Sequence, residues 1–358
     1  MKKIAIDCRL LDIQKNTGIS RYTEYMVNYY IDRFGEGGVL IVSNVSTKYT
    51  RIEHAITDLK PFSIYGFLKF RKFLSGLDIY LYHSPFYSSV HRKIEGLKTI
   101  LTVHDLMYRI LPDFFSDNKF INMLARFYYE LIVRASIRAS DKVVAVSAIT
   151  AKDLKDVFNI ESLIIPENSS IKVSVDFSII EKNKLNCKGY YFYCGNARRH
   201  KNIDFISEVF AKNQDLPPLV LAGHGHKQLK NVMCVGVVSD EELRALYENA
   251  IAFIFPSKYE GFGLPILEAL NAGGQIVASK IPAFLEFNTP SIHFFTLGNE
   301  SEFVSALISA KNNPKETSAE FFANYSDEFI YGKFNEMLMD FYSLRSQGFD
   351  SIDKRDLS

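Results

Sequence analysis

Short, almost uninterrupted apolar runs recur along this chain of 358 residues, and stretches with helical periodicity separate them. Apolar runs without polar alternation are typical of strands buried on both faces of a parallel sheet, and the intervening helical patterns are typical of crossovers in βαβ units. The first half contains six expected strands, at 3–7, 39–45, 78–84, 99–105, 142–147 and 162–166. The rhythm then restarts, with expected strands at 190–196, 218–225, 232–238, 250–257, 275–280 and 293–298.

These two series of alternating strand and helix patterns predict an α/β protein with two successive parallel sheets, because the chain is too long for one ordinary core. The expected division is one domain in residues 1–175, a second in 176–326, and a C-terminal helix with a polar tail in 327–358. We interpret the polar stretch 176–189 as the hinge. The C-terminal helix, at 327–345, has an apolar face and therefore needs a partner.

Composition narrows the class of protein further. The formal net charge is +1, with a mildly basic first half and no run of like charges, so nucleic acid is not an expected partner. The mild positive charge of the first half is compatible with binding to an anionic membrane surface or an anionic acceptor. No CxxC spacing is present, and the four cysteines are expected to be reduced core residues of a cytosolic protein: Cys8, Cys187, Cys194 and Cys234.

Neither a leader nor a membrane span is expected. The start, MKKIAID, is basic, but Asp7 and Arg9 interrupt its apolar stretch after three residues, so we interpret it as a strand. No window of about 18 apolar residues occurs in the chain.

The stretch YEGFGLPILEALNAGG, residues 259–274, carries the most specific chemistry. Pro265 marks the first turn of a helix that follows a strand, so Gly261 and Gly263 fall where free backbone N–H groups and the helix dipole can bind an anion. Glu260 and Glu268 flank that turn and can accept hydrogen bonds from hydroxyl groups. A ligand with phosphate between two polyols, such as a nucleotide-sugar, fits this pattern; alternatively, the glycines only permit a tight turn and the glutamates are solvated.

This stretch resembles the glutamate-x7-glutamate motif of family 4 glycosyltransferases. Other segments resemble the family in the same order along the chain: NTGISRY (16–22), TVHDL (102–106), VSAITAKDL (146–154), YCGNARRHKN (193–202) and LYENAIAFIFPS (246–257). The 259–268 motif is specific, whereas the others are weak singly. Together they cover most of the chain, and the hinge and the acceptor-facing loops match least.

The resemblance implies a GT-B fold, in which two Rossmann-like domains face a cleft and the C-terminal helix crosses back to the first domain. It implies a retaining, metal-independent enzyme that holds its donor mainly in the second domain. The nucleotide-sugar would contact backbone or side chains at Gly261, Phe262, Gly263, Leu264 and Glu268. Glu260 would hold the sugar, Glu268 the ribose hydroxyls.

The basic loop after residue 194 is the expected diphosphate site. Arg198, Arg199 and Lys201 lie at the carboxyl end of a strand, where cations can stabilise a leaving nucleoside diphosphate. By resemblance Lys201 matches the family's lysine, and we favour Arg198 over Arg199 as its arginine. The alternative is a solvated basic loop.

Two positions of the first domain are expected to face the same cleft. Gly18 is by sequence an ordinary turn glycine, and the resemblance places it near the donor's distal phosphate. His104 closes a strand, where a lone histidine is usually a satisfied structural residue, and the resemblance places it in the donor-sugar pocket. The expected catalytic set is therefore Glu260, His104, Lys201 and Arg198. Asp105 either orients His104 or caps a loop.

Three further features of the sequence bear on cofactors, metals and membranes. Gly223 and Gly225 form half of a dinucleotide fingerprint without its third glycine, which argues against a nicotinamide cofactor. No Asp-x-Asp pair occurs and the histidines lack ligand spacing, so no metal is expected. The segment 65–76 interleaves phenylalanines with basic residues, which fits either an interfacial helix on an anionic leaflet or an amphipathic core helix.

The function expected from these observations is transfer of a hexose, first of all mannose from GDP-mannose, to a glycan or lipid-linked acceptor of surface polysaccharide synthesis. The protein would be cytoplasmic, at or near the inner face of the cytoplasmic membrane. UDP-hexoses remain an alternative donor. A GT-B-like phosphorylase or epimerase, and a catalytically silent nucleotide-sugar-binding protein, remain alternative classes.

Overall fold

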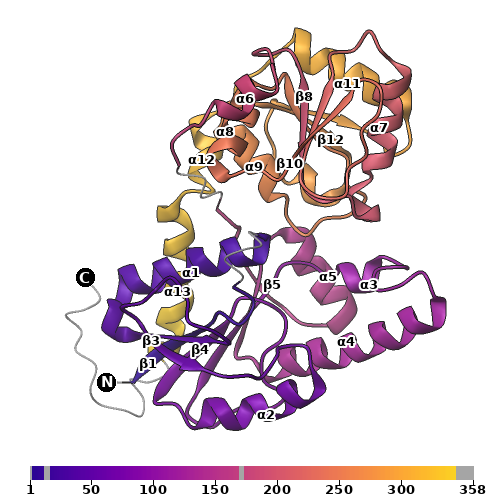
Figure 1. Cartoon of the computed structure of the whole chain (residues 1–358). Helices are drawn as coiled ribbons and strands as arrows, with labels where there is room; N and C mark the ends of the chain where they lie inside the picture. The colour runs from indigo at the N-terminus through magenta and orange to yellow at the C-terminus, as the bar shows by residue number, and fades with distance from the viewer. Residues whose placement is uncertain (1, 12–16, 169–172, 344–358) are drawn as a thin grey trace.

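The computed structural model describes residues 2–11, 17–168 and 173–343, and it contains two parallel β-sheets stacked end to end (Figure 1). The first sheet has the order β3-β2-β1-β4-β5-β6-β7. Its strands are β1 (Lys3–Asp7), β2 (Val39–Ser43), β3 (Glu53–Ile56), β4 (Ile79–Ser84), β5 (Lys98–Val103), β6 (Lys142–Ala145) and β7 (Leu163–Ile164). The second sheet has the order β10-β9-β8-β11-β12-β13. Its strands are β8 (Tyr191–Cys194), β9 (Leu219–Ala222), β10 (Val232–Gly236), β11 (Ala252–Phe255), β12 (Gln275–Ser279) and β13 (Ile292–Phe295).

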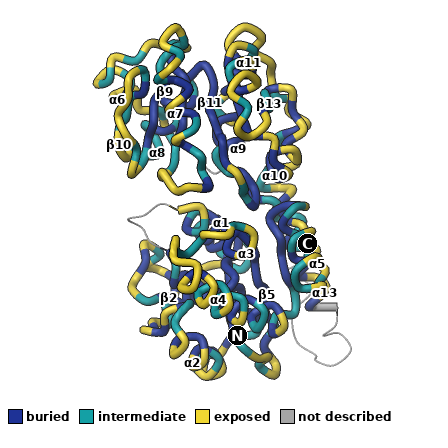
Figure 2. The backbone as a smooth tube through the Cα atoms, turned by 90° about the vertical axis from the view of Figure 1, so that its right-hand side faces the viewer, coloured by how far each residue is buried: buried dark blue, intermediate teal, exposed yellow. Residues whose placement is uncertain are grey.

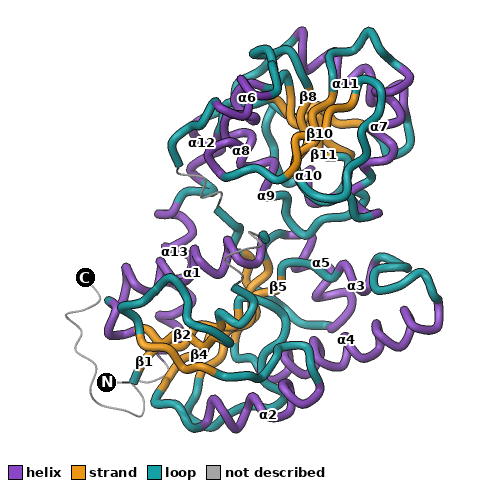
Figure 3. Tube along the Cα trace, in the orientation of Figure 1, coloured by secondary structure: helices purple, strands orange, loops and turns teal. Residues whose placement is uncertain are grey.

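Helices cover both faces of each sheet (Figure 3). In the first domain these are α1 (Gly18–Phe34), η1 (Glu36–Gly38), α2 (Ile64–Ser75), α3 (Met107–Ile110), α4 (Lys119–Ala139) and α5 (Ala148–Phe158). In the second they are α6 (Ser178–Lys182), η2 (Arg199–Lys201), α7 (Ile203–Lys212), α8 (Asp240–Asn249), α9 (Leu264–Asn271), α10 (Pro282–Leu285), α11 (Glu300–Asn312) and α12 (Ala319–Ala323). The last helix is α13 (Asp327–Ser343). None of the helices in the described part of the chain has the length and apolarity needed to cross a membrane.

The central strands are buried along their whole length, as their unbroken apolar sequences predict (Figure 2). All pairings within both sheets are parallel. The prediction of two Rossmann-like α/β domains is therefore confirmed. One edge strand, β3, was not predicted, because its sequence EHAI lacks the uniform apolar character on which the prediction depended.

The predicted hinge at 176–189 is wrong. Within that range, Ile179 is buried in the core of the second domain, and α6 packs against α8. The backbone N–H of Asp176 already donates to the carbonyl of Glu241 at 3.2 Å. A polar stretch can still belong to a domain when its few apolar side chains point inward, so the chain has entered the second domain by Asp176.

The C-terminal helix α13 returns to the first domain (Figure 1). One of its faces is buried in the core of the first sheet, through Ile330, Phe334, Met337, Leu338 and Phe341. The Tyr29 hydroxyl on α1 donates to the Asn335 side-chain oxygen at 2.9 Å. The partner that the apolar face of this helix requires is therefore the α1 side of the first domain, as predicted.

The cysteines correct one further expectation, and the segment 65–76 favours one of its two alternatives, the amphipathic core helix. All four cysteines are free, but Cys187 is exposed in the loop before β8 and is not a core residue. In α2 the side chains of Phe67 and Phe70 are buried, so these aromatics build the core and do not face solvent.

Truncation of Phe334 tests whether α13 is an integral part of the first domain. This side chain is fully buried, so Phe334→Ala should lower the free energy of unfolding by about 3 to 5 kcal/mol. Urea denaturation followed by circular dichroism measures this. The matched control on the same helix is Met339→Ala, whose side chain is half exposed and should change stability little. Equal midpoints for the two variants would contradict the docking of α13.

Candidate active site

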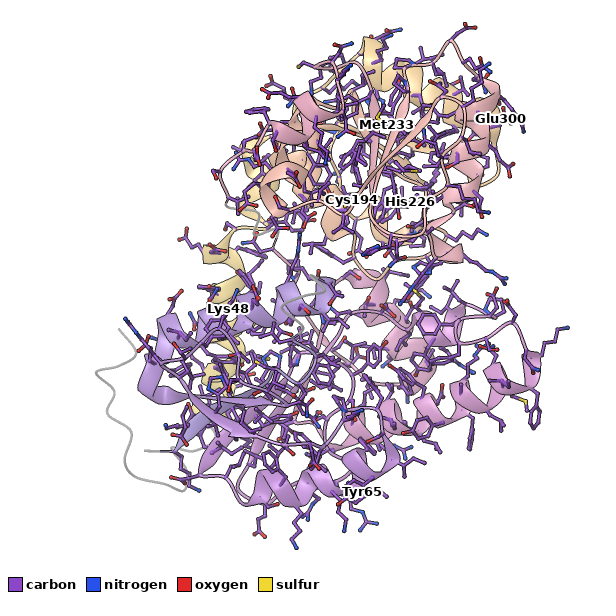
Figure 4. All side chains as sticks on the ribbon, viewed as in Figure 1. Lys48, Tyr65, Cys194, His226, Met233 and Glu300 are labelled. Atoms are coloured by element: carbon purple, nitrogen blue, oxygen red, sulfur yellow. The ribbon has the colours of Figure 1, made fainter. Side chains whose placement is uncertain are left out.

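The carboxyl ends of the two sheets face each other across the domain junction. In the first domain His104 follows β5 and Ser147 follows β6, and in the second the loops after β8 and β11 carry residues 195–202 and 256–263. Figure 4 shows Cys194, the last residue of β8, at the edge of the second domain that faces the first. Ligands of open α/β sheets bind beyond the carboxyl ends of the strands, so the candidate site lies at this junction.

Gly261 lies in close contact with the first domain. A Cβ atom at this residue would lie 1.8 Å from the carbonyl oxygen of His104. This distance is too short for any non-glycine residue at this position. The Thr150 hydroxyl lies 3.1 Å from the Gly261 carbonyl and 3.0 Å from that of His104, and the Ser147 hydroxyl donates to Gly261 as well. The bare backbone at Gly261 is thus required by domain contact, a reason the sequence did not reveal.

Gly263 is required by a different contact. It adopts φ 131°, and a Cβ atom there would lie 3.0 Å from the ring of Phe287 and 3.2 Å from that of Phe284. The side chain of Phe262 is buried and packs edge-on against Phe287. Leu264 begins helix α9. The free N–H groups of this turn remain the predicted anion site, while the side chain of Phe262 belongs to the core.

The predicted diphosphate and sugar residues are brought together. Lys201 Nζ lies 2.7 Å from Glu260 Oε1 and 5.0 Å from the centroid of the Phe255 ring. Both charged side chains are less than one-fifth exposed. Burial keeps the neighbouring His200 neutral by lowering its pKa to about 4, although Glu260 opposes this shift. A partly buried lysine held by a carboxylate is a preformed cation at the carboxyl end of the second sheet.

The second predicted glutamate, Glu268, is bound by a residue of the other domain. Arg21 on α1 pairs with Glu268 and with Asp240, and the Tyr247 hydroxyl donates to Glu268 at 3.1 Å. Burial raises the pKa of Glu268, and the charge of Arg21 and the Tyr247 hydrogen bond limit that rise. The carboxylate expected to hold ribose is therefore in contact with the first domain.

Sequence reasoning missed Arg21. The quoted segment NTGISRY contains it, but only Gly18 was selected. A signal was available, because Arg21 lies three residues after Gly18 and so shares its side of the helix. Gly18 itself is exposed at the start of α1, where a Cβ atom would have no neighbour within 4 Å.

His104 is buried and uses both ring nitrogens. Nδ1 lies 2.6 Å from Glu167 Oε1, and Nε2 lies 2.8 Å from the carbonyl oxygen of Pro85. Although burial disfavours the charge, the hydrogen bond and charge of Glu167 and the Pro85 carbonyl raise the pKa of His104. Two acceptors on one ring favour the imidazolium. Glu167 was also missed, because the sequence suggested only the adjacent Asp105 as a carboxylate partner for His104.

The remaining candidates, Arg198, Arg199 and Asp105, differ in their contacts. Arg199 pairs with Asp113 and Asp117 of the first domain, and its side chain is largely exposed. Arg198 is exposed and makes no ion pair with the residues that the structure describes. This arrangement leaves Arg198 available to a ligand, while Arg199 bridges the domains. Asp105 accepts a hydrogen bond from the Met107 N–H at 2.7 Å, so it caps the turn into α3.

The Arg21–Glu268 pair makes stability depend on pH. In Arg21→Met the buried carboxyl loses its cation, so the pKa of Glu268, already raised, should rise further. Below that pKa the carboxyl is protonated and the loss is small; as pH rises through it, an unpaired buried charge should cost about 3 kcal/mol. Urea unfolding at pH 5 and pH 8 measures the difference. The double variant Arg21→Met/Glu268→Gln should lack this pH dependence, and a deficit equal at both pH values would refute the pairing.

The His104–Glu167 pair has a separate pH signature. Because the pKa of His104 is raised, its charged form adds stability that is present below about pH 6.5 and is lost as pH rises through the raised pKa. Glu167→Gln should therefore lower the pKa of His104 and destabilise the protein most near pH 6, with a smaller deficit at pH 9. NMR titration of the histidine rings and urea unfolding report the two effects, and an unchanged His104 titration would rule out this coupling.

Family models match both halves of the chain. One described as Glycosyltransferase Family 4 matches residues 18–166, and one described as Glycosyl transferases group 1 matches residues 176–327. Similar curated proteins include the O-antigen chain mannosyltransferase RfbU of Salmonella typhimurium, 25% identical over 70% of this chain and 71% of the relative. The O-antigen chain mannosyltransferase B of Escherichia coli is 28% identical over 58% of each chain.

Solved structures with 13–15% sequence identity share the fold. Sucrose-phosphate synthase from Thermosynechococcus elongatus has a TM-score of 0.74 at 15% identity and covers 96% of this chain and 100% of that one. Anabaena HepE in complex with UDP-glucose has a TM-score of 0.69 at 13% identity, with coverage of 95% and 100%. Two Rossmann-like domains with a returning helix, and the two family models that together cover most of the chain, lead to one conclusion: this chain belongs to the group 1/family 4 glycosyltransferases.

Proposed function

We propose that this protein transfers a mannosyl residue from GDP-mannose to a glycan or lipid-linked acceptor in surface polysaccharide synthesis. The observation that carries the proposal is the partly buried Lys201–Glu260 pair at the carboxyl end of the second sheet, with Glu268 one helical turn into α9. A cation for the diphosphate thus lies beside a carboxylate for the sugar. Glu268 is then placed to bind the ribose.

The choice of mannose and of surface polysaccharide comes from the relatives. RfbU and mannosyltransferase B are both named as O-antigen chain mannosyltransferases. UDP-glucose is bound by HepE, which shares the fold at 13% identity, so it does not favour UDP for this chain. GDP-mannose is therefore the first donor to test and a UDP-hexose the second.

The proposed mechanism relies on positioning and charge. Departure of the nucleoside diphosphate breaks the bond between the sugar's anomeric carbon and the phosphate oxygen. Lys201, Arg198 and the N–H groups at Gly263 and Leu264 neutralise the charge that develops on that phosphate. The acceptor hydroxyl attacks from the same face, so the anomeric configuration is retained, and its proton passes to the departing phosphate oxygen. No protein nucleophile and no metal ion take part in this scheme.

In this scheme His104 lines the donor-sugar pocket as a fixed charge. Its two nitrogens both donate, to Glu167 and to Pro85, so it has no lone pair with which to act as a base. Its backbone carbonyl meanwhile contacts Gly261. His104 therefore borders the sugar pocket with its side chain and contacts the second domain with its backbone carbonyl.

Binding of the donor also requires an exchange of partners. The ribose hydroxyls must take the place of Arg21 on Glu268, and the diphosphate must compete with Glu260 for Lys201. Each released side chain remains next to the ligand. The exchange replaces ion pairs between protein groups by contacts with the donor.

A thermal-shift series with GDP, GDP-mannose, UDP and UDP-glucose, with and without EDTA, tests the donor and the independence from metal. Binding to the folded state raises the melting temperature by mass action. A shift with GDP and GDP-mannose that survives EDTA is the expected result. A shift with UDP compounds alone would replace the donor, and loss of the GDP shift in EDTA would overturn metal independence.

Lys201→Met should lower kcat/KM roughly 100-fold to 1,000-fold, because a preorganised cation facing the leaving group is lost. The assay is mannosyl transfer or slow hydrolysis of GDP-mannose, with NMR of the anomeric proton reporting the product configuration. Lys258→Met is the matched control, since its side chain is exposed nearby on the loop that follows β11. Comparable losses in both variants would show only a nonspecific effect of charge.

A further inference from the structure

Helix α5 meets the second domain with its first two turns, and Figure 2 shows α10 of that domain next to it. Hydrogen bonds join this end of α5 to two parts of the second domain, residues 259–261 of the loop after β11 and Glu286. The first-domain side chains at this contact are Ser147, Thr150 and Asp153, here called the α5 clamp. Because the same loop carries Glu260, the α5 clamp lies next to the carboxylate proposed to hold the sugar.

Both chain neighbours of Glu260 are bonded to the α5 clamp. On one side, the Tyr259 hydroxyl donates to Asp153 Oδ2 at 2.7 Å. On the other side, the carbonyl oxygen of Gly261 lies 3.1 Å from Thr150 Oγ1. Glu260 therefore belongs to the second domain, while the residues before and after it are held by the first.

Thr150 also reaches the first-domain side of the proposed sugar pocket. Its hydroxyl lies 3.0 Å from the carbonyl oxygen of His104 and 3.1 Å from that of Gly261. A hydroxyl has a single hydrogen, so the two carbonyls share it in a bifurcated bond. The Thr150 side chain is fully buried, and no water competes for these contacts. One hydroxyl thus joins the backbone of His104 to the backbone next to Glu260.

A carboxylate of the second domain holds the clamp end of α5 in place. Glu286 accepts the backbone N–H groups of Ala148 and Ile149 at 2.9 and 2.7 Å. An acidic side chain at the N-terminus of a helix is favourable, because it complements the helix dipole and the free N–H groups there. The first turn of α5 is therefore bound to the second domain independently of the loop that carries Glu260.

These contacts determine where the Glu260 side chain points. Fixing the carbonyl of Gly261 and the side chain of Tyr259 fixes the backbone between them, and with it the direction in which the carboxylate leaves the chain. The carboxylate lies 2.7 Å from Lys201 Nζ, so the same contacts place this pair relative to His104. A misplacement of about 1 Å in a reacting group can lower a rate about 100-fold.

We propose that Ser147, Thr150 and Asp153 are positioning residues, through which the first domain sets the place of Glu260 in the sugar pocket. None of the three needs to touch the donor, because they act on the loop. That the α5 clamp holds residues 259–261 follows from the contacts alone. Its effect on transfer rests on the proposed function.

Hydrogen–deuterium exchange of the full chain tests the hold on the loop without any donor. Thr150→Val removes the hydroxyl but keeps the shape of the side chain, so a peptide spanning 259–263 should exchange roughly 10-fold faster. Thr150→Ser restores the hydroxyl and should exchange like wild type. Thr99→Val is the matched control, because that hydroxyl is also buried and lies 3.2 Å from the Ala139 carbonyl at the opposite end of β5. Unchanged exchange of 259–263 in Thr150→Val would overturn the proposal.

Kinetics test whether the α5 clamp acts through Glu260. Thr150→Val should lower kcat for hydrolysis of GDP-mannose roughly 10-fold, and Thr150→Ser should recover most of it. The thermal shift with GDP should stay unchanged, because the proposed nucleotide contacts are Lys201 and Glu268. In a Glu260→Ala background, Thr150→Val should lower kcat further by less than about 2-fold, since no carboxylate is left to position.

Equal losses of kcat in the wild-type and Glu260→Ala backgrounds would refute the positioning role, as would an equal loss in Thr99→Val. If Thr150→Val fails to fold, Tyr259→Phe removes the hydrogen bond to Asp153 and carries the same expectations. A wild-type protein that hydrolyses neither GDP-mannose nor UDP-glucose would count against the proposed function. The exchange measurement would then still decide whether the α5 clamp holds the loop.

Discussion

The approach of Gly261 to the carbonyl of His104 is the constraint on which the junction between the domains depends. Any side chain at residue 261 would overlap that oxygen, so the loop after β11 can meet the strand end of β5 only as bare backbone. The hydroxyls of Ser147 and Thr150 hold the two segments in register. Because this contact fixes the separation of the sheets, it also fixes how far Lys201 and Glu268 lie from the first domain.

Charges across the junction are arranged around that contact. Glu286 of the second domain accepts the backbone N–H groups of Ala148 and Ile149 at 2.9 and 2.7 Å, which adds a carboxylate to the N-terminus of α5. Arg21 reaches in the other direction, from α1 to Glu268. Each domain therefore supplies hydrogen-bonding or charged partners for groups of the other domain. The helix ends involved also border the candidate site.

Much of the fold could be predicted from the sequence, because buried parallel strands have a local signature. Uniform apolar runs identified the central strands of both sheets, and the apolar face of residues 327–345 indicated a helix that needs a partner. The edge strand β3 and the position of the hinge could not be predicted this way. An edge strand is half solvated and has a mixed sequence, and a polar segment such as 176–189 contains too few apolar residues to show which core takes them.

For the candidate site, the sequence by itself determined which chemical groups are available: the turn before α9, two glutamates with seven residues between them, and a basic loop after β8. Tertiary structure alone decided their partners, namely Lys201 with Glu260, Arg21 with Glu268 and Glu167 with His104. The physical reason is the distance along the chain between the residues that interact. Helix starts, turns and strand runs are set by interactions within a few residues, whereas these pairs join residues 59 to 247 positions apart. Folding of each domain brings two of the pairs within reach, and packing of the two domains brings together Arg21 and Glu268.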